Sequence, residues 1–173
     1  MILGMSTETY TLIHVIISLI GIGSGLVVVF GLLGSKRLDG WTALFLVTTV
    51  ATSVTGFFFP FHKFTPAIGV GIISLVLLAL AILARYVFHL AGGWRRTYVI
   101  SSVIALYLNV FVLIVQLFEK VPALNALAPT QSEPPFKITQ VVVMAVFVVL
   151  GILAVRGFRK PTVLLRDATA RAA

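Results

Sequence analysis

Residues 97–119, TYVISSVIALYLNVFVLIVQLFE, form an apolar run that is long enough to cross a bilayer as a helix. Four polar side chains share one face of this helix, at intervals of seven, seven and three residues: Ser102, Asn109, Gln116 and Glu119. Polar groups in hydrocarbon have no water to bond, so they normally face other helices or a wet cavity. The stripe therefore predicts a bundle of helices around this segment.

The composition excludes most classes of soluble protein. Of the 173 residues, 60% are hydrophobic and 10% are charged, whereas soluble domains contain about 25% charged residues. The chain has no cysteine, which excludes disulfides, thiolate chemistry, Cys-ligated zinc, iron–sulfur clusters and covalently attached haem. A metal or haem would need other ligands, and the chain has only three histidines.

Five apolar runs approach the roughly 20 residues that a helix needs to cross the hydrocarbon core. They are residues 10–33, 41–59, 66–90, 97–118 and 138–156. We therefore expect an all-α membrane protein, with a five-span bundle over residues 1–160 and a cytoplasmic tail over 161–173. No basic segment or cleavage signature precedes the first run, which we interpret as a retained helix. A four-span alternative, with the fifth run on the membrane surface, is disfavoured because that run has no charged face.

The distribution of lysine and arginine predicts the orientation. With five spans, ten of the thirteen basic residues lie on the side of the C-terminus and three on the other side. Because basic residues accumulate in cytoplasmic loops, we expect the N-terminus outside and the C-terminus in the cytoplasm. The net charge of +8 is then a topology signal, and we expect no nucleic-acid partner.

Five polar side chains lie in the outer half of the predicted membrane region: His14, Asn109, Gln116, Glu119 and Gln140. Polar and ionisable residues within a span are candidates for function. Their shared depth predicts a polar pocket near the outer face, for a lipid, a quinone or another small amphipathic ligand. Asn109 lies past the middle of its span, and we expect it to find a partner in His14 or Gln140.

His14 also has two other interpretations. It shares a helix face with Ser18, Gly21 and Gly25, and small residues let membrane helices approach closely, so a packing seam with a hydrogen-bonded His14 is one of them. The other is a metal site, because two histidines can ligate a b-type haem. His14 and His62, both near the outer surface, would then hold haem b or copper, although no spacing forces them together.

Three further features of the sequence bear on the fold, and two of them also allow a functional role. The second run carries five hydroxyl residues, which either pack by bonding to backbone carbonyls or line a polar cavity: Thr48, Thr49, Thr52, Ser53 and Thr55. The fifth run places Gln140, Met144, Phe147 and Gly151 on one face. The connection at 120–137 is either a rigid surface segment or a lid or docking surface over the pocket.

Four basic side chains lie at the predicted cytoplasmic boundary: Arg85, His89, Arg95 and Arg96. Arg85 and His89 are four residues apart and share a helix face. Long basic side chains near a helix end extend to the headgroups, where anionic lipids attract them. We therefore predict that these four residues contact lipid headgroups.

Four segments of the chain resemble small hydrophobic proteins of proteobacteria that are described as hypothetical membrane proteins: FFFPFHKFTP, ARYVFHLAG, LYLNVFVLIVQ and PALNALAPTQSEPPF. The similarity runs from the second apolar run to the start of the fifth. It implies a location in the bacterial inner membrane. It implies no activity, and it assigns no functional residue.

The sequence contains no nucleotide-binding glycine loop, no His-Glu-x-x-His, no Gly-x-Ser-x-Gly and no pair of intramembrane carboxylates. We therefore lean against an enzyme and expect an integral inner-membrane binding or accessory protein, with membrane lipid, a second copy or a larger complex as partner. A homo-oligomeric channel or small-solute transporter is the alternative. A redox module on His14 and His62 is a further one.

Overall fold

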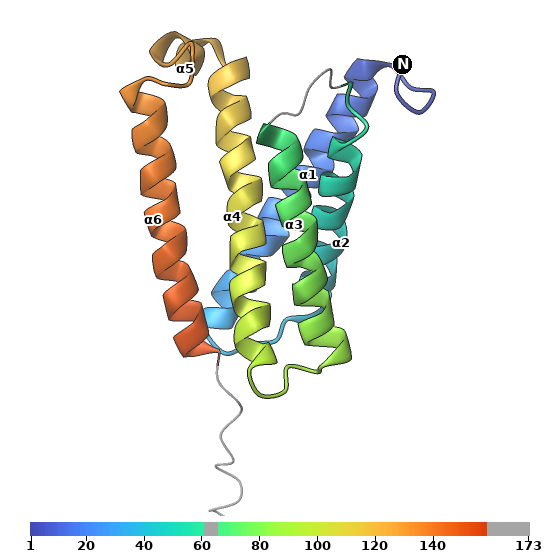
Figure 1. Ribbon diagram of the computed structural model, residues 1–173, viewed down its shortest axis with the longest axis vertical. Helices are drawn as coiled ribbons and strands as arrows, with labels where there is room; N and C mark the ends of the chain where they lie inside the picture. Colours follow the sequence, from blue (N-terminus) through green and yellow to red (C-terminus); the bar gives the residue numbers. More distant parts are fainter. Residues whose placement is uncertain (61–65, 159–173) are drawn as a thin grey trace, which may run out of the picture.

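The computed structural model describes residues 1–60 and 66–158 as a bundle of helices (Figure 1). The elements are α1 (Thr7–Leu33), α2 (Asp39–Gly56), α3 (Pro66–Ile82), the π-helix η1 (Leu83–Val87), α4 (Trp94–Lys120), α5 (Pro122–Leu127) and α6 (Pro134–Gly157). These described residues contain no β-strand, and only an isolated bridge joins Ile2 to Met5. The predicted all-α fold is confirmed.

Four helical segments in the described part of the chain are long and apolar enough to cross a membrane: α1, α3 with η1 (Pro66–Val87), α4 and α6. The chain is therefore a multi-pass membrane protein by length and composition. The predicted run at 41–59 corresponds to α2, which has 18 residues. It is not one of these four segments, and its interior carries threonines and a serine.

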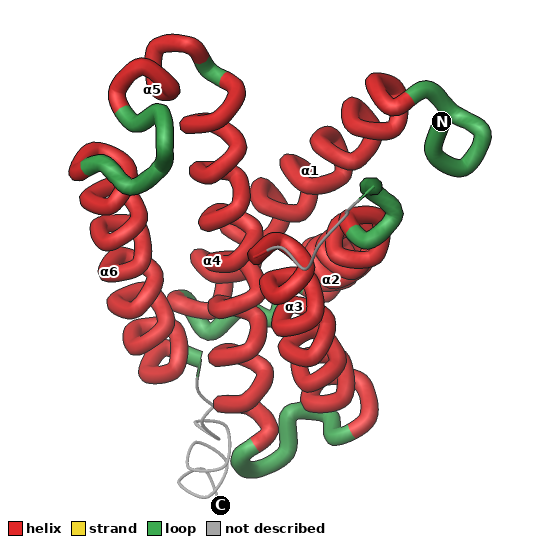
Figure 2. Tube along the Cα trace, turned by 45° about the horizontal axis from the view of Figure 1, so that its top comes forward, coloured by secondary structure: helices red, strands yellow, loops and turns green. Residues whose placement is uncertain are grey.

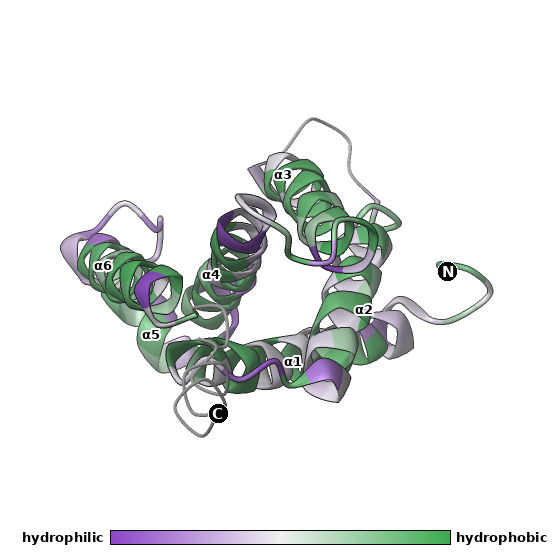
Figure 3. Ribbon diagram, turned by 90° about the horizontal axis from the view of Figure 1, so that it is seen from below, coloured by the Kyte–Doolittle hydropathy of each residue, from purple (hydrophilic) through white to green (hydrophobic). Residues whose placement is uncertain are grey.

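The five long helices form a curved row that α1 closes. Seen from below in Figure 3, α6, α4, α3 and α2 follow one another, and α1 crosses the open side. Figure 2 shows that α1 slants across the bundle, from the end of α6 toward α2. Accordingly, α1 packs against α2, α4 and α6, while α3 packs between α2 and α4.

Glycines allow the close approach of α1 to its neighbours. A Cβ atom on Gly25 would lie 2.6 Å from Cδ1 of Leu106 and 2.8 Å from Cδ2 of Phe45. A Cβ atom on Gly157 of α6 would lie 2.5 Å from the carbonyl oxygen of Leu33. All three distances are shorter than the contacts that real Cβ atoms make, so a larger residue at either position would force its neighbours to shift. The predicted packing seam along α1 is therefore confirmed.

A second, smaller core lies at the end of the bundle where α4 leads into α5, and it joins α4, α5 and α6. Its buried members are Ile114, Phe118 and Ala128, with Phe136 packed against them. The rings of Phe118 and Phe136 meet edge to face at 5.4 Å. Because α5 begins at Pro122, a residue suited to a first helical turn, the connection folds back onto α4. The segment between α4 and α6 is thus packed in the described structure.

Candidate functional site

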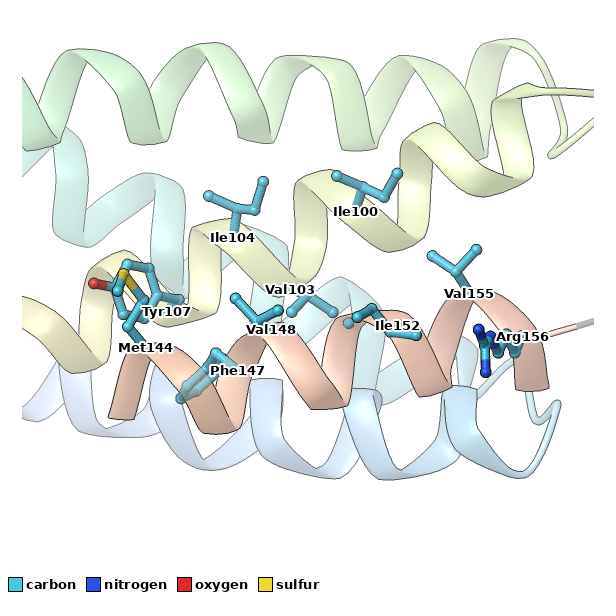
Figure 4. Close-up of a pocket in the computed structure, with 11 residues that line it drawn as sticks. Ile100, Val103, Ile104, Tyr107, Met144, Phe147, Val148, Ile152, Val155 and Arg156 are labelled. Carbon is cyan, nitrogen blue, oxygen red and sulfur yellow. The ribbon is translucent and has the colours of Figure 1, made fainter. Parts of the chain in front are cut away.

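An apolar groove of about 490 Å³ runs between α4 and α6. Figure 4 shows Tyr107 and Met144 at one end of the groove and Arg156 at the other. The lining comes from Ile100, Val103, Ile104 and Tyr107 of α4, and from Met144, Phe147, Val148, Gly151, Ile152, Val155 and Arg156 of α6. The groove is therefore a hydrocarbon surface with a single charged group, and that group lies at one end.

Two features of the sequence shape this groove. Gly151 lacks a side chain where α6 meets α4, and a Cβ atom there would lie 3.5 Å from Cγ1 of Val103, an ordinary contact. At the other end, the ring of Tyr107 packs against Phe147 at 5.7 Å and against Phe111 at 6.2 Å. The helices therefore approach each other closely at Gly151, and the ring of Tyr107 lies at one end of the groove.

The groove contains part of a pattern that the sequence displayed. Met144, Phe147 and Gly151, which the sequence placed on one face of the last helix, all line it. Tyr107 and Arg156 were not expected in a site. The signal that would have found Tyr107 is the apolar spacing Ile100, Ile104, Tyr107, which puts these residues on one face of α4.

Asn109 has a partner on α2. Its Nδ2 donates to Oγ1 of Thr49 over 3.5 Å, at the long end of the hydrogen-bonding range. Gly21 of α1 lies against the same group, since a Cβ atom there would be 3.2 Å from the hydroxyl oxygens of Thr48 and Thr49. Asn109 thus marks the place where α1, α2 and α4 meet. Our expectation that His14 or Gln140 would be its partner was wrong.

His14 belongs to a second contact between α1 and α2. Its Nδ1 lies 2.8 Å from Oγ1 of Thr55, and its ring meets Phe59 edge to face at 5.2 Å. One turn away, the hydroxyl of Tyr10 donates to the carbonyl of Thr55 over 2.8 Å. His14 is thus hydrogen-bonded within the packing seam, as one of its interpretations predicted.

The predicted metal pair involves a residue outside the described ranges, because His62 lies between residues 60 and 66. Within the described ranges, no group of three or more histidine, aspartate and glutamate side chains could hold a metal ion. The pairing of His14 with His62 stays a prediction.

Gln140 belongs to a set of amides that attach α6, and the connection between α4 and α6, to α4. Its Nε2 donates to the carbonyl of Phe111 over 3.2 Å. Similar bonds of 3.0 and 3.2 Å run from Gln131 to the carbonyl of Val115 and from Asn125 to the carbonyl of Phe118. The three carbonyls follow one face of α4. The Oε1 atom of Gln140 is buried without a hydrogen-bond partner among the described residues.

The other two residues of the predicted pocket lie on the surface. Gln116 is exposed, and Glu119 pairs with Lys120 over 2.8 Å. Of the five predicted pocket residues, His14 contacts Thr55, Asn109 contacts Thr49 and Gln140 contacts Phe111. Each therefore has its own surroundings, and no hydrogen bond between described residues joins any two of the five.

The guanidinium of Arg85 is buried at the end of the bundle where η1 leads into α4. It forms an ion pair with Asp39, donates to the carbonyl of Arg37 over 2.9 Å and lies 5.2 Å from the ring centre of Tyr98. Contact with the headgroups had been expected, but the side chain is 3% exposed. A sequence signal existed: Ser74, Leu78 and Ala81 are the buried residues of α3, and Arg85 continues their spacing.

The other three predicted headgroup residues lie at the same end of the molecule. His89 and Arg96 are exposed. Arg95 is half-buried, with its guanidinium 5.6 Å from the ring centre of Phe158. Their contact with lipid headgroups stays a prediction.

Comparison with known proteins gives no relative: no family model, no curated protein and no solved structure matches the chain.

Proposed function

We propose that this chain is a non-enzymatic binding or accessory protein of the bacterial inner membrane. In this proposal, the groove between α4 and α6 holds the apolar part of a lipid, a quinone or another small amphipathic molecule. The observation that supports this proposal is the groove itself. Its volume of about 490 Å³ lies within the range of about 300–1,000 Å³ for ligand sites, and its lining matches a hydrocarbon chain.

This site replaces the polar outer pocket as our leading candidate. His14, Asn109 and Gln140 each form a hydrogen bond with a neighbouring helix. Such bonds between helices are a common packing device in membranes. The groove, by contrast, is lined mainly by hydrocarbon side chains, so an apolar ligand that enters it buries few polar groups.

We further propose that α2 is a fifth span. Its 18 residues extend about 27 Å at 1.5 Å per residue, which approaches the roughly 30 Å of the hydrocarbon core. The threonine hydroxyls do not oppose insertion, because those of Thr48, Thr52 and Thr55 donate to carbonyls of their own helix. With five spans, the lysine and arginine count places the N-terminus outside.

A channel or transporter is the second candidate, favoured by polar groups along the contact of α1, α2 and α4. His14 with Thr55 and Asn109 with Thr49 lie toward one end, and Thr42 lies 3.3 Å from the hydroxyl of Tyr98 toward the other. Phe45 and Leu106 are fully buried between these groups. They close the seam, so conduction would require them to move.

Liposome flux assays test this second candidate. A sealed seam predicts no flux of small solutes through the wild-type protein. Substituting Phe45→Ala would open it and is expected to produce flux if the seam leads across the membrane. Solute flux through wild-type protein would favour transport over ligand binding. The redox alternative has a separate test, since haem b or copper on His14 and His62 would give an optical spectrum.

Filling the groove tests the leading proposal. The variant Gly151→Leu adds a large side chain to the groove lining between α4 and α6, whereas Gly151→Ala adds only an ordinary contact with Val103. The matched control is Gly23→Leu, because a Cβ atom on Gly23 of α1 meets no heavy atom within 4 Å. All four proteins, including wild type, are purified gently and their bound lipids and quinones are measured by mass spectrometry.

We expect wild type, Gly151→Ala and Gly23→Leu to retain a bound amphipathic molecule that Gly151→Leu loses. Equal retention by Gly151→Leu would overturn the proposal. So would a wild-type protein that carries no such molecule.

A further inference from the structure

The length of the groove matches one leaflet of a bilayer. Along α6, its lining runs from Met144 to Arg156, which is about 18 Å at 1.5 Å per residue. Half of a hydrocarbon core is about 15 Å. With Arg156 placed at headgroup level, the groove, which runs from Tyr107 to Arg156 (Figure 4), would extend from near the middle of the membrane to its boundary. That is the span of one acyl chain of one leaflet.

Arginines from both helices flank the boundary end of the groove. Arg156 of α6 lines the groove directly and is exposed. Arg96 of α4 is exposed and precedes Ile100 by four residues, so it lies on the helix face that carries the groove lining. Two positive groups thus stand where the headgroup of a lipid in the groove would lie.

We propose that the groove holds one acyl chain of an anionic phospholipid, whose headgroup is bound by Arg96 and Arg156. This assignment rests on the proposed function of the groove and names its ligand. Guanidinium groups bind phosphate through paired, charge-assisted hydrogen bonds. A neutral quinone ring would gain little from two cations. In the proposed topology this end faces the cytoplasm, so the lipid comes from the cytoplasmic leaflet.

Arg95 provides a comparison within the same turn of helix. It carries the same charge as Arg96 and is its neighbour in sequence, but its guanidinium lies over the ring of Phe158. A general attraction of lipid to this end of the molecule would treat the two arginines alike. If the groove is a specific lipid site, lipid binding should depend on Arg96 and Arg156 more than on Arg95.

Native mass spectrometry of the full chain in detergent tests the proposal, with dioleoyl phosphatidylglycerol and dioleoyl phosphatidylcholine added at equal concentration. We expect the wild type to bind phosphatidylglycerol preferentially. Arg96→Gln and Arg156→Gln should each reduce this preference about fivefold, since each basic residue near a membrane contributes on this scale. Lys120→Gln, which removes an exposed cation beside Glu119 at the other end, should leave it unchanged, and Arg95→Gln should reduce it less.

Two results would overturn the headgroup assignment: equal binding of the two lipids by wild type, or a preference that Arg96→Gln and Arg156→Gln leave intact. Equal losses in Lys120→Gln would show charge attraction without a site and would overturn it as well. If both lipids bind equally and Gly151→Leu still abolishes binding, the proposed function stands and only the lipid class is wrong. Absence of any bound lipid overturns the headgroup assignment, and it overturns the proposed function as well if no quinone or other amphipathic molecule is bound.

Discussion

The guanidinium of Arg85 in the π-helix η1 forms an ion pair with the carboxylate of Asp39, in the first turn of α2. The pair is asymmetric, because the side chain of Arg85 is 3% exposed and that of Asp39 is 84% exposed. It connects two segments that are distant in sequence at one end of the bundle. A π-helical turn within a helix often marks a functional or constrained position, and here it holds a buried cation.

Removing the carboxylate should destabilise the bundle. In Asp39→Asn, the buried guanidinium keeps the carbonyl of Arg37 and the ring of Tyr98 but loses its counter-charge. We expect a loss of about 1–2 kcal/mol in the free energy of unfolding, less than for a fully buried pair because water screens Asp39. Thermal unfolding in detergent measures this loss. The double variant Arg85→Met/Asp39→Asn should recover stability, and no recovery would contradict a buried unpaired charge as the cause.

Gly25 should not tolerate even a methyl group. In Gly25→Ala, the new Cβ atom would lie 2.6 Å from Leu106 and 2.8 Å from Phe45, both fully buried. Such overpacking costs about 1–3 kcal/mol, visible as a lower midpoint of thermal unfolding. Gly23→Ala, at an open position on the same helix, should change stability by less than about 0.5 kcal/mol. Equal effects of the two substitutions would show that the close approach of α1 does not limit stability.

Replacing Gln140 should distinguish a packing role from ligand contact. Gln140→Met loses the hydrogen bond to Phe111 but also removes the buried Oε1 atom that has no partner in the described structure. These two effects on the free energy of unfolding have opposite signs. Loss of the hydrogen bond and removal of a buried polar atom without a partner each change it by roughly 1 kcal/mol, so they nearly cancel. We expect a small change in thermal stability and an unchanged amount of bound lipid. Loss of bound lipid with unchanged stability would restore Gln140 to the ligand site.

Glu133 should titrate at an unusually low pH. Desolvation, the largest single effect, raises its pKa, but hydrogen bonds from the hydroxyl of Thr130 and from the backbone N–H groups of Thr130 and Ser132 together outweigh it, so the pKa is lower than usual. The folded carboxylate is thus favoured, and its stabilising effect is present at neutral pH. It is lost as the pH falls through the lowered pKa. Carbon-13 NMR of the side chain measures this titration, and Thr130→Val should raise the pKa toward its usual value.

The sequence alone determined the class of fold. Runs of about 20 apolar residues allow few structures other than membrane helices, because the bilayer provides no partners for an open backbone. The small residues of α1 also identified its packing face, since Gly21, Gly25 and His14 share one side of a helix whatever the neighbours are. These are local properties of one segment, and they can be read from the spacing of its residues along the sequence.

Only the tertiary structure decided which polar residues meet. His14, Asn109 and Gln140 share a predicted depth in the membrane, but depth does not specify direction, and their helices turn them toward Thr55, Thr49 and Phe111. The groove also depends on how α6 docks on α4, because Tyr107 and Arg156 come from different helices. Spacing within one helix fixes a face, whereas the identity of the opposing face depends on the packing of the whole bundle.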